Sequence, residues 1–243
     1  SVDYIDENGN FVHYTEYARR IRNLEEIPSP YTSGLMDRYF DGQWLPIIQT
    51  NRGCPFTCTF CVEGNDFYTK VFKSGFERVK SELEYIADKA ESIDNDKKRR
   101  DLHIADSNFG MYKEDIDTCK VINRLQSKYG FPEYINVATG KNQKQRVLEA
   151  ARLVNGALRL SGSVQSLDAS VLKNIKRNNI SLDSLVEMAL EAREAGANTY
   201  SEIILGLPGD TITAHFESIR RIIESEFNIV CLYQLMLLPG TDM

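Results

Sequence analysis

Three cysteines lie within eight positions of this 243-residue chain. Cys54, Cys58 and Cys61 form a C-x3-C-x2-C run in the stretch NRGCPFTCTFCVEG. They cannot all form disulfides with one another, because one thiol always stays unpaired. Three thiolates on one loop can instead point toward a shared metal group in a reducing compartment. A 4Fe-4S cluster held in this way has one iron without a protein ligand.

A structural zinc ion is an alternative occupant, and it needs a fourth ligand from elsewhere in the chain. The remaining candidates are Cys119, Cys231, His13, His103 and His215. None of them adjoins the three cysteines at the spacing of a zinc knuckle. We assign neither further cysteine to the metal group and expect structural roles for the histidines. Zinc and a plain electron-transfer cluster stay open as alternatives.

The elements that must position this loop alternate along the chain, with short apolar segments followed by amphipathic helical patterns. The expected strands are residues 45–50, 101–106, 134–139, 157–164, 199–207 and 229–237. The expected helices are residues 76–90, 113–129, 143–154, 182–195 and 211–225, several of which end near a glycine. Strands that alternate with helices predict a parallel sheet covered by helices.

The predicted fold is therefore α/β, a partial (βα)6 TIM-like barrel formed by residues 43–243. Residues 1–42 are expected to be an irregular lead-in or interdomain linker. Ligands in parallel barrels bind where the strands end, and the cysteine loop follows the first strand, so it should lie at that mouth. The chain stops directly after the sixth strand, where a covering helix is expected. We therefore expect the barrel to be truncated at its C-terminus.

Charge and hydropathy exclude two classes of partner. The formal net charge is −6, and the longest basic run, residues 97–100, stands between acidic residues, so a phosphate backbone gains little from this surface. We therefore exclude nucleic acid. No stretch approaches the roughly eighteen apolar residues of a membrane span, and the first residues lack the features of a signal peptide. We predict a cytoplasmic protein without a membrane partner.

The run CPFTCTFC after the first strand resembles the cluster motif of radical S-adenosylmethionine (radical SAM) enzymes, and the resemblance spans residues 43–243. It implies that Cys54, Cys58 and Cys61 hold a 4Fe-4S cluster whose open iron is chelated by the amino and carboxylate groups of SAM. It also implies that an electron from the cluster cleaves SAM to a 5′-deoxyadenosyl radical. The implied partners are a small-molecule substrate and an external electron donor such as flavodoxin or ferredoxin.

Two further segments resemble parts of that family's SAM site. Phe60 stands where members set an aromatic or apolar residue against the adenine. The segment ADSNFGM stands in place of a Gly-Gly-Glu-like turn for the SAM amino group, so the expected contacts are Asp106, Ser107 and Asn108. This departure removes the glycines, but a carboxylate or carbonyl at the turn could accept from an ammonium. The alternative is a plain turn in which Asp106 bonds its own backbone.

The later strands carry the remaining expected SAM contacts. The segment GSVQS and the helix after it resemble the coproporphyrinogen-oxidase-like branch, which implies that Gln165 contacts a ribose hydroxyl or the SAM carboxylate and Arg177 the carboxylate. Arg177 could instead be a solvated helix end. Glu202 stands where that branch has an acidic residue for the ribose hydroxyls. Ile204 and Gly206 are the expected adenine contacts.

The segment before the first strand resembles the connection that follows an N-terminal cobalamin-binding domain in some radical SAM proteins. That domain, and its D-x-H-x-x-G motif, are not in this chain. The resemblance implies that the intact protein could use cobalamin for methylation, while cyclisation and other radical rearrangements remain open. The alternative from another class is a non-catalytic metal-binding barrel, with an iron-sulfur or zinc site, that serves as a scaffold or electron carrier.

Overall fold

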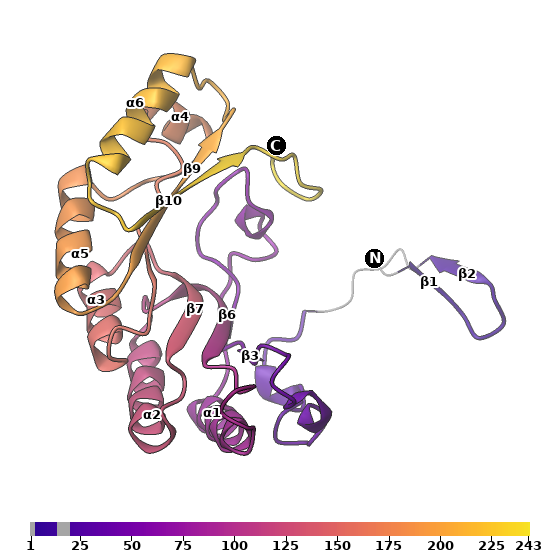
Figure 1. Cartoon of the computed structure of the whole chain (residues 1–243). Helices are drawn as coiled ribbons and strands as arrows, with labels where there is room; N and C mark the ends of the chain where they lie inside the picture. Colours follow the sequence, from indigo (N-terminus) through magenta and orange to yellow (C-terminus); the bar gives the residue numbers. More distant parts are fainter. Residues whose placement is uncertain (1–2, 14–19) are drawn as a thin grey trace.

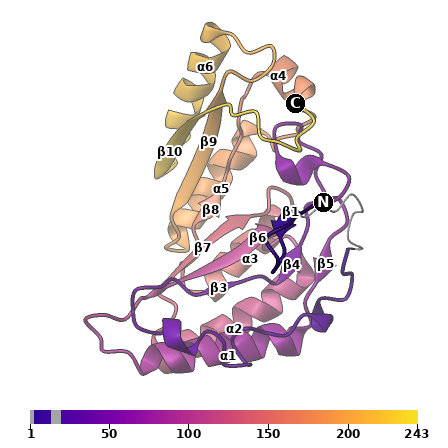
Figure 2. The ribbon, with the colours of Figure 1, turned by 90° about the vertical axis from the view of Figure 1, so that its right-hand side faces the viewer.

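The computed structural model describes residues 3–13 and 20–243 of the chain. Within these residues, parallel strands follow one another in chain order as two three-stranded sheets, β3-β6-β7 and β8-β9-β10. A parallel bridge between Ile135 and Leu158 joins the two sheets. The strands are β3 (Ile47–Ile48), β6 (Asp101–Phe109), β7 (Tyr134–Thr139), β8 (Leu160–Ser161), β9 (Thr199–Leu205) and β10 (Ile229–Gln234). Together they form the open arc seen in Figures 1 and 2.

Helices cover the outer face of this arc, and each lies between consecutive strands of the chain (Figure 1). They are α1 (Phe76–Glu91), α2 (Lys113–Tyr129), α3 (Lys144–Leu153), α4 (Ala169–Asn174), α5 (Leu182–Glu194) and α6 (Ile212–Ile223). Apolar residues on one face of each long helix pack against the strands, as the sequence periodicity predicts. Leu102 and Ile104 of β6 and Ile86 of α1 are fully buried in this layer. The predicted α/β partial barrel is thus confirmed.

The fourth predicted strand, residues 157–164, is interrupted because its residues change partners. Leu158 bridges to β7, Leu160 and Ser161 pair with β9, and Gln165 forms a further bridge to Ile203 of β9. The side chain of Thr139 also accepts a hydrogen bond from the Ser161 amide at 2.8 Å. This segment therefore closes the gap between the two sheets rather than extending as one regular strand.

Helix α4 was not among the helices predicted from periodicity, because six residues are too few to show a helical period, and only the resemblance of GSVQS and the segment after it indicated a helix here. Its N-terminus is fixed by Asp168, whose side chain accepts from the amides of Ser170 and Val171 at 2.8 and 3.0 Å. Such a cap satisfies amides that have no partner within the helix. The helix leads to Arg177, so its short length decides where that side chain lies.

The expected lead-in contains an antiparallel hairpin of β1 (Asp3–Ile5) and β2 (Phe11–His13). In the part of the chain from residue 20 onward, the 3-10 turns η1 (Leu24–Glu26) and η2 (Asp37–Tyr39) lie beside α1. Tyr31 is buried between these turns, and its hydroxyl donates to the Ile47 carbonyl at 2.8 Å and accepts from the Ile47 amide at 2.9 Å. The boundary at residue 42 stays a prediction.

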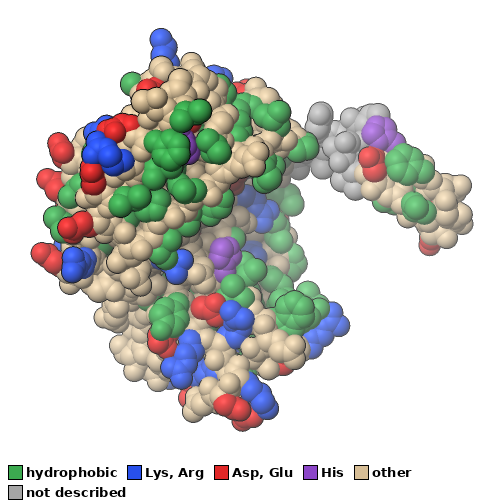
Figure 3. Space-filling model, turned by 45° about the horizontal axis from the view of Figure 1, so that its top comes forward, with side chains coloured by type: hydrophobic (Ala, Val, Ile, Leu, Met, Phe, Trp, Pro, Cys, Tyr) green, Lys and Arg blue, Asp and Glu red, His purple; other side chains and the backbone are tan. Residues whose placement is uncertain are grey.

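The far flank of the arc exposes apolar side chains. Phe216 of α6 and Leu232 and Tyr233 of β10 are all more than half exposed. Figure 3 shows hydrophobic side chains gathered on the upper part of the molecule, where α6 and β10 lie. No helix among the described residues is long and apolar enough to cross a membrane.

The central strand β6 should respond strongly to loss of packing. Leu102→Ala removes a fully buried side chain, so we expect the free energy of unfolding to fall by about 2 to 5 kcal/mol. Leu190→Ala is the matched control, because Leu190 of α5 is 46% exposed and should change the stability by less than about 0.5 kcal/mol. Urea unfolding followed by circular dichroism measures both values. Equal losses in the two variants would contradict the placement of β6 at the core.

Candidate functional site

The cysteine loop is held at its base by a short antiparallel pair, β4 (Asn51–Arg52) with β5 (Phe72–Lys73). The Cys54 amide donates to the Tyr68 carbonyl at 2.9 Å, which closes the loop further. The loop is wound tightly, because a Cβ atom added at Gly64 would lie 2.1 Å from the Cys58 carbonyl oxygen. The glycine beside the 3-10 turn η3 (Val62–Gly64) is therefore required by a close backbone approach.

A buried carboxylate anchors the start of this loop. Asp106 of β6 accepts from the amides of Thr50 and Asn51 at 2.8 and 3.3 Å and from the Asn51 side-chain amide at 2.7 Å. The Thr50 hydroxyl is a fourth donor. Burial raises the pKa of Asp106 to about 7, while these hydrogen bonds act in the opposite direction. The expected contact between Asp106 and a SAM ammonium is not what the structure shows, since this carboxylate faces the loop base.

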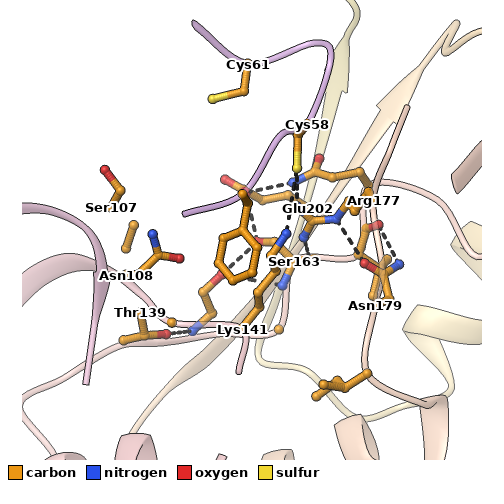
Figure 4. Close-up of a pocket in the computed structure, with 18 of the residues that line it drawn as sticks. Cys58, Cys61, Ser107, Asn108, Thr139, Lys141, Ser163, Arg177, Asn179 and Glu202 are labelled. Carbon is orange, nitrogen blue, oxygen red and sulfur yellow. Dashed lines mark hydrogen bonds between the residues drawn. The ribbon is translucent and has the colours of Figure 1, made fainter. Parts of the chain in front are cut away.

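A cavity of about 280 Å³ lies at the C-terminal ends of β6 to β9, beneath the cysteine loop (Figure 4). The structure brings most of the expected site residues together in its wall, although they are far apart in the chain. Those that line it are Cys54, Cys58, Cys61, Phe60, Ser107, Asn108, Gln165, Arg177 and Glu202. This is the end of a parallel barrel at which ligands bind.

Two expected adenine contacts, Ile204 and Gly206, are not part of this wall. Ile204 packs instead in a small apolar cluster around Val171, Ile175 and Leu207, and Phe60 packs against the same cluster. Phe60 therefore joins the cavity to the cluster, with Ile204 behind it. Gly206 has a φ of +85°, and the space around its Cα is open.

Donor groups surround the sulfur atoms of the loop. The Asn108 amide donates to Cys54 Sγ at 3.3 Å, while Lys141 Nζ lies 3.7 Å and Arg177 Nη1 3.8 Å from Cys58 Sγ. Cationic and N–H donors that face sulfur suit an anionic iron-sulfur group. Among the described residues, no three Cys, His, Asp or Glu side chains gather closely enough to hold a single metal ion. A 4Fe-4S cluster does not need this, because each thiolate binds a different iron.

The opposite wall carries hydrogen-bond acceptors. Glu202 Oε2 accepts from Ser163 Oγ at 2.8 Å and from Gln165 Nε2 at 3.5 Å. Gln165 has a φ of +64°, fixed by backbone bonds with Glu202 and Ile204 at 2.8 and 2.9 Å. Its Oε1 is buried without a hydrogen-bond partner among the described residues. A buried acceptor without a partner carries a free-energy cost that a ligand's hydroxyl or ammonium could remove.

Arg177 points into the cavity rather than to solvent (Figure 4). Its Nε donates to Asn179 Oδ1 at 2.9 Å, and its Nη2 donates to the Ser163 carbonyl. Asn179 is itself held by the carbonyls of Val164 and Ser166, at 2.8 and 3.0 Å. The guanidinium is therefore preorganised, and Nη1 faces the cysteine loop, where it could bind a carboxylate.

Several lining residues were missed by the sequence analysis, and Lys141 is the main one. It lies two residues beyond the end of β7, and its Nζ lies 3.8 Å from the centroid of the Phe56 ring. Burial lowers the pKa of Lys141 below its ordinary value, with a further contribution from the charge of Arg177. Glu63, which accepts from Ser107 Oγ, was also missed. A position just after a predicted barrel strand was the available signal for Lys141.

Comparison with known proteins gives one family match and several relatives. The model of the radical SAM superfamily matches residues 48–222. The chain is 31% identical over 236 residues to the cobalamin-dependent radical SAM methyltransferase TokK of Streptomyces tokunonensis, covering 93% of this chain and 34% of that protein. It is also 31% identical over 233 residues to a 2-(S-pantetheinyl)-carbapenam-3-carboxylate methyltransferase of Streptantibioticus cattleyicolor, covering 92% of this chain and 33% of that one.

The fold is also similar to that of a solved structure. The radical S-adenosylmethionine methyltransferase TsrM from Kitasatospora setae, with tryptophan substrate and the SAM analogue aza-SAM bound, superposes with a TM-score of 0.68 at 18% identity. The match covers 86% of this chain and 39% of TsrM. The chain thus spans about a third of the length of the curated relatives it matches first. These comparisons do not favour the alternative of a non-catalytic metal-binding barrel.

The Asp106 anchor should make stability depend on pH. A carboxyl whose folded pKa of about 7 exceeds its unfolded value of about 4 holds its proton more tightly when folded. The stabilisation of the folded chain by this group is therefore fully present below pH 4 and is lost as the pH rises through 7. We expect the unfolding free energy to fall by about 2 to 4 kcal/mol between pH 4 and pH 8 because of this group.

The variant Asp106→Asn isolates that effect, since it does not titrate. Urea unfolding at pH 4 and pH 8 should show a smaller fall in the variant than in the wild-type chain. Asp115, whose pKa is raised to about 6 by burial, titrates in both proteins and its charge also raises the pKa of Asp106, so the difference between the two proteins reports Asp106 together with this coupling. An equal fall in the two proteins would show that Asp106 does not titrate in this range.

Proposed function

Because the chain belongs to the radical SAM superfamily, we propose that its barrel binds a 4Fe-4S cluster and SAM and cleaves SAM reductively. One observation carries the proposal: three cysteine thiols, an arginine and a carboxylate from distant parts of the chain line one cavity at the strand ends. The donors around Cys54 and Cys58 and the buried free acceptor of Gln165 fit these two groups.

Cys54, Cys58 and Cys61 would each hold one iron and leave the fourth for SAM. When bound and reduced, the cluster supplies the electron that splits SAM into methionine and a 5′-deoxyadenosyl radical. Arg177 Nη1 would donate to the SAM carboxylate, and the bonds of Nε and Nη2 to Asn179 and Ser163 hold the guanidinium in place before the ligand arrives.

The remaining lining residues would orient the rest of SAM. Glu202 and Gln165 accept from the vicinal ribose hydroxyls, since a carboxylate and an amide oxygen are both acceptors. Ser107 and Asn108, which lie near the end of β6 rather than in the expected turn, are beside the cysteine loop and would receive the ammonium group. Phe60 would contact the adenine, with Ile204 packed behind it, and Gly206, two residues further along the chain, stays an expected adenine contact. Together these walls would shield the reacting atoms from water.

The activity of the whole protein is a further part of the proposal. The relatives that match over nearly all of this chain carry names of cobalamin-dependent or carbapenam methyltransferases. We infer that the intact protein uses cobalamin to methylate a small molecule, with cyclisation and other radical rearrangements as the competing outcomes. A one-electron donor such as flavodoxin or ferredoxin would reduce the cluster. The free thiols of this chain fit a reducing compartment such as the cytoplasm.

Anaerobic reconstitution of the 243-residue chain with iron and sulfide tests the cluster directly. We expect a brown protein with about four irons per chain, and reduced protein plus SAM should release 5′-deoxyadenosine. Cys58→Ala should lose most of the iron and all of this release, because one ligand is gone. Iron analysis, absorbance and chromatography of the nucleoside give the three readouts.

Cys119→Ala is the matched control, since Cys119 is buried within α2 and lies outside the cavity wall. It should keep its iron and its 5′-deoxyadenosine release. A colourless protein with one zinc per chain would refute the cluster. Normal release from Cys58→Ala would refute the ligand assignment.

Glu202→Gln tests the ribose contact. Loss of a charged acceptor should weaken SAM binding about tenfold, in the range of one hydrogen bond to a charged group. Equilibrium dialysis of the cluster-loaded protein against labelled SAM measures the affinity. Glu217→Gln on the exposed surface of α6 removes the same charge outside the cavity and should leave the affinity unchanged. Wild-type affinity in Glu202→Gln would remove this residue from the SAM site.

A further inference from the structure

We propose that Lys141 is a positioning residue for electron transfer, whose ammonium stands beside the Cys58 sulfur and raises the reduction potential of the cluster. The inference rests on the cluster of the proposed function. Lys141 contacts the cluster ligand Cys58 and is not one of the residues expected to bind SAM. It predicts a measurable potential in the absence of any substrate.

The position of Lys141 is fixed by its neighbours. Its Nζ lies 3.7 Å from Cys58 Sγ and 3.8 Å from the centroid of the Phe56 ring, which belongs to the cysteine loop itself. An ammonium over an aromatic face is attracted by the ring quadrupole. The preceding Gly140 lets the turn approach closely, because a Cβ there would lie 2.7 Å from Met111 Cβ. The ammonium is therefore held on the loop that carries the cysteines.

The charge of Lys141 is not neutralised by the protein. Among the described residues no carboxylate lies within ion-pair distance of its Nζ, which instead has Cys58 and Phe56 as its partners. Lys144, three positions further on, lines the same cavity but contacts Glu187 Oε2 at 3.0 Å and Glu191 Oε1 at 3.3 Å. The two lysines of this cavity wall thus differ in their partners: Lys141 contacts the Cys58 sulfur and the Phe56 ring, whereas two carboxylates compensate the charge of Lys144.

Simple charge counting gives the direction of the effect. An oxidised 4Fe-4S core of charge +2 with three thiolates carries about −1, and one added electron makes it about −2. A nearby positive charge stabilises the more negative, reduced state, so the potential rises. Arg177 is the second cation near Cys58, but it also donates to Asn179 and the Ser163 carbonyl. We assign its remaining donor group, Nη1, to the SAM carboxylate, although it also lies 3.8 Å from Cys58 Sγ, so Lys141 is the cation left for the cluster.

The test is a redox titration of reconstituted protein without SAM. Dithionite is the one-electron donor, mediator dyes set the potential, and the electron paramagnetic resonance signal reports the reduced cluster. Lys141→Met should lower the midpoint potential by about 59 mV or more, a tenfold change in the reduction equilibrium for a one-electron couple. Lys141→Arg keeps the charge and should stay near the wild-type potential.

Two further variants separate charge from other effects. Lys144→Met removes an equal charge from the same wall and should leave the potential close to wild type, because its carboxylates already compensate that charge. Lys141→Gln keeps an N–H donor without the charge and should shift nearly as far as Lys141→Met. Should Lys141→Met fail to hold iron, Lys141→Gln decides the question, and it should lower the potential.

The proposal fails if Lys141→Met or Lys141→Gln holds about four irons and titrates at the wild-type potential. It also fails if Lys144→Met lowers the potential as much as Lys141→Met, since the effect would then be one of net charge alone. Loss of the cluster from the wild-type chain would instead refute the proposed function. The two inferences can therefore fail separately.

Discussion

The cavity depends on one buried interaction, the set of hydrogen bonds that the Asp106 carboxylate receives from Thr50 and Asn51. These bonds join the second barrel strand to the residues between the first strand and the cysteine loop. Later in the loop, further bonds tie it to the barrel, from the Thr59 amide to the Ile175 carbonyl at 3.2 Å and from Ser107 Oγ to Glu63, but the Asp106 bonds hold its start. Two effects act in opposite directions on the pKa of Asp106. Burial disfavours the ionised carboxylate and raises the pKa, whereas the hydrogen-bond donors favour the ionised form and lower it. The anchor therefore fixes where the cysteine loop begins on the barrel.

The sequence was sufficient to predict the barrel and the place of the loop because both rest on local patterns. Apolar strands bounded by turn residues, alternating with amphipathic helices, lead to a parallel sheet whose loops meet at one end. That rule alone brings Cys58, Gln165 and Glu202 into one cavity, although more than a hundred residues separate the first from the last. Binding of iron and SAM by these residues remains a proposal.

What the sequence did not predict depends on contacts between segments. Asp106 has the right type and position for a ligand contact, and only the three-dimensional structure shows its oxygens occupied by Thr50 and Asn51. The irregular course of residues 157–165 arises because neighbouring residues pair with different strands. No sequence motif marks Lys141. Its proposed role rests on its short distance to Cys58 Sγ and on the lack of a carboxylate partner among the described residues.

Ser163 explains how opposite charges can share so small a cavity without cancelling. Its carbonyl accepts from the Arg177 guanidinium while its hydroxyl donates to the Glu202 carboxylate at 2.8 Å. A direct ion pair between the two would use the donors and acceptors of both side chains and would cost free energy to open. With Ser163 between them, each keeps part of its hydrogen-bonding capacity for a ligand. SAM has a carboxylate and a ribose with two hydroxyl donors, so under the proposed function both groups would be bound without first breaking a salt bridge.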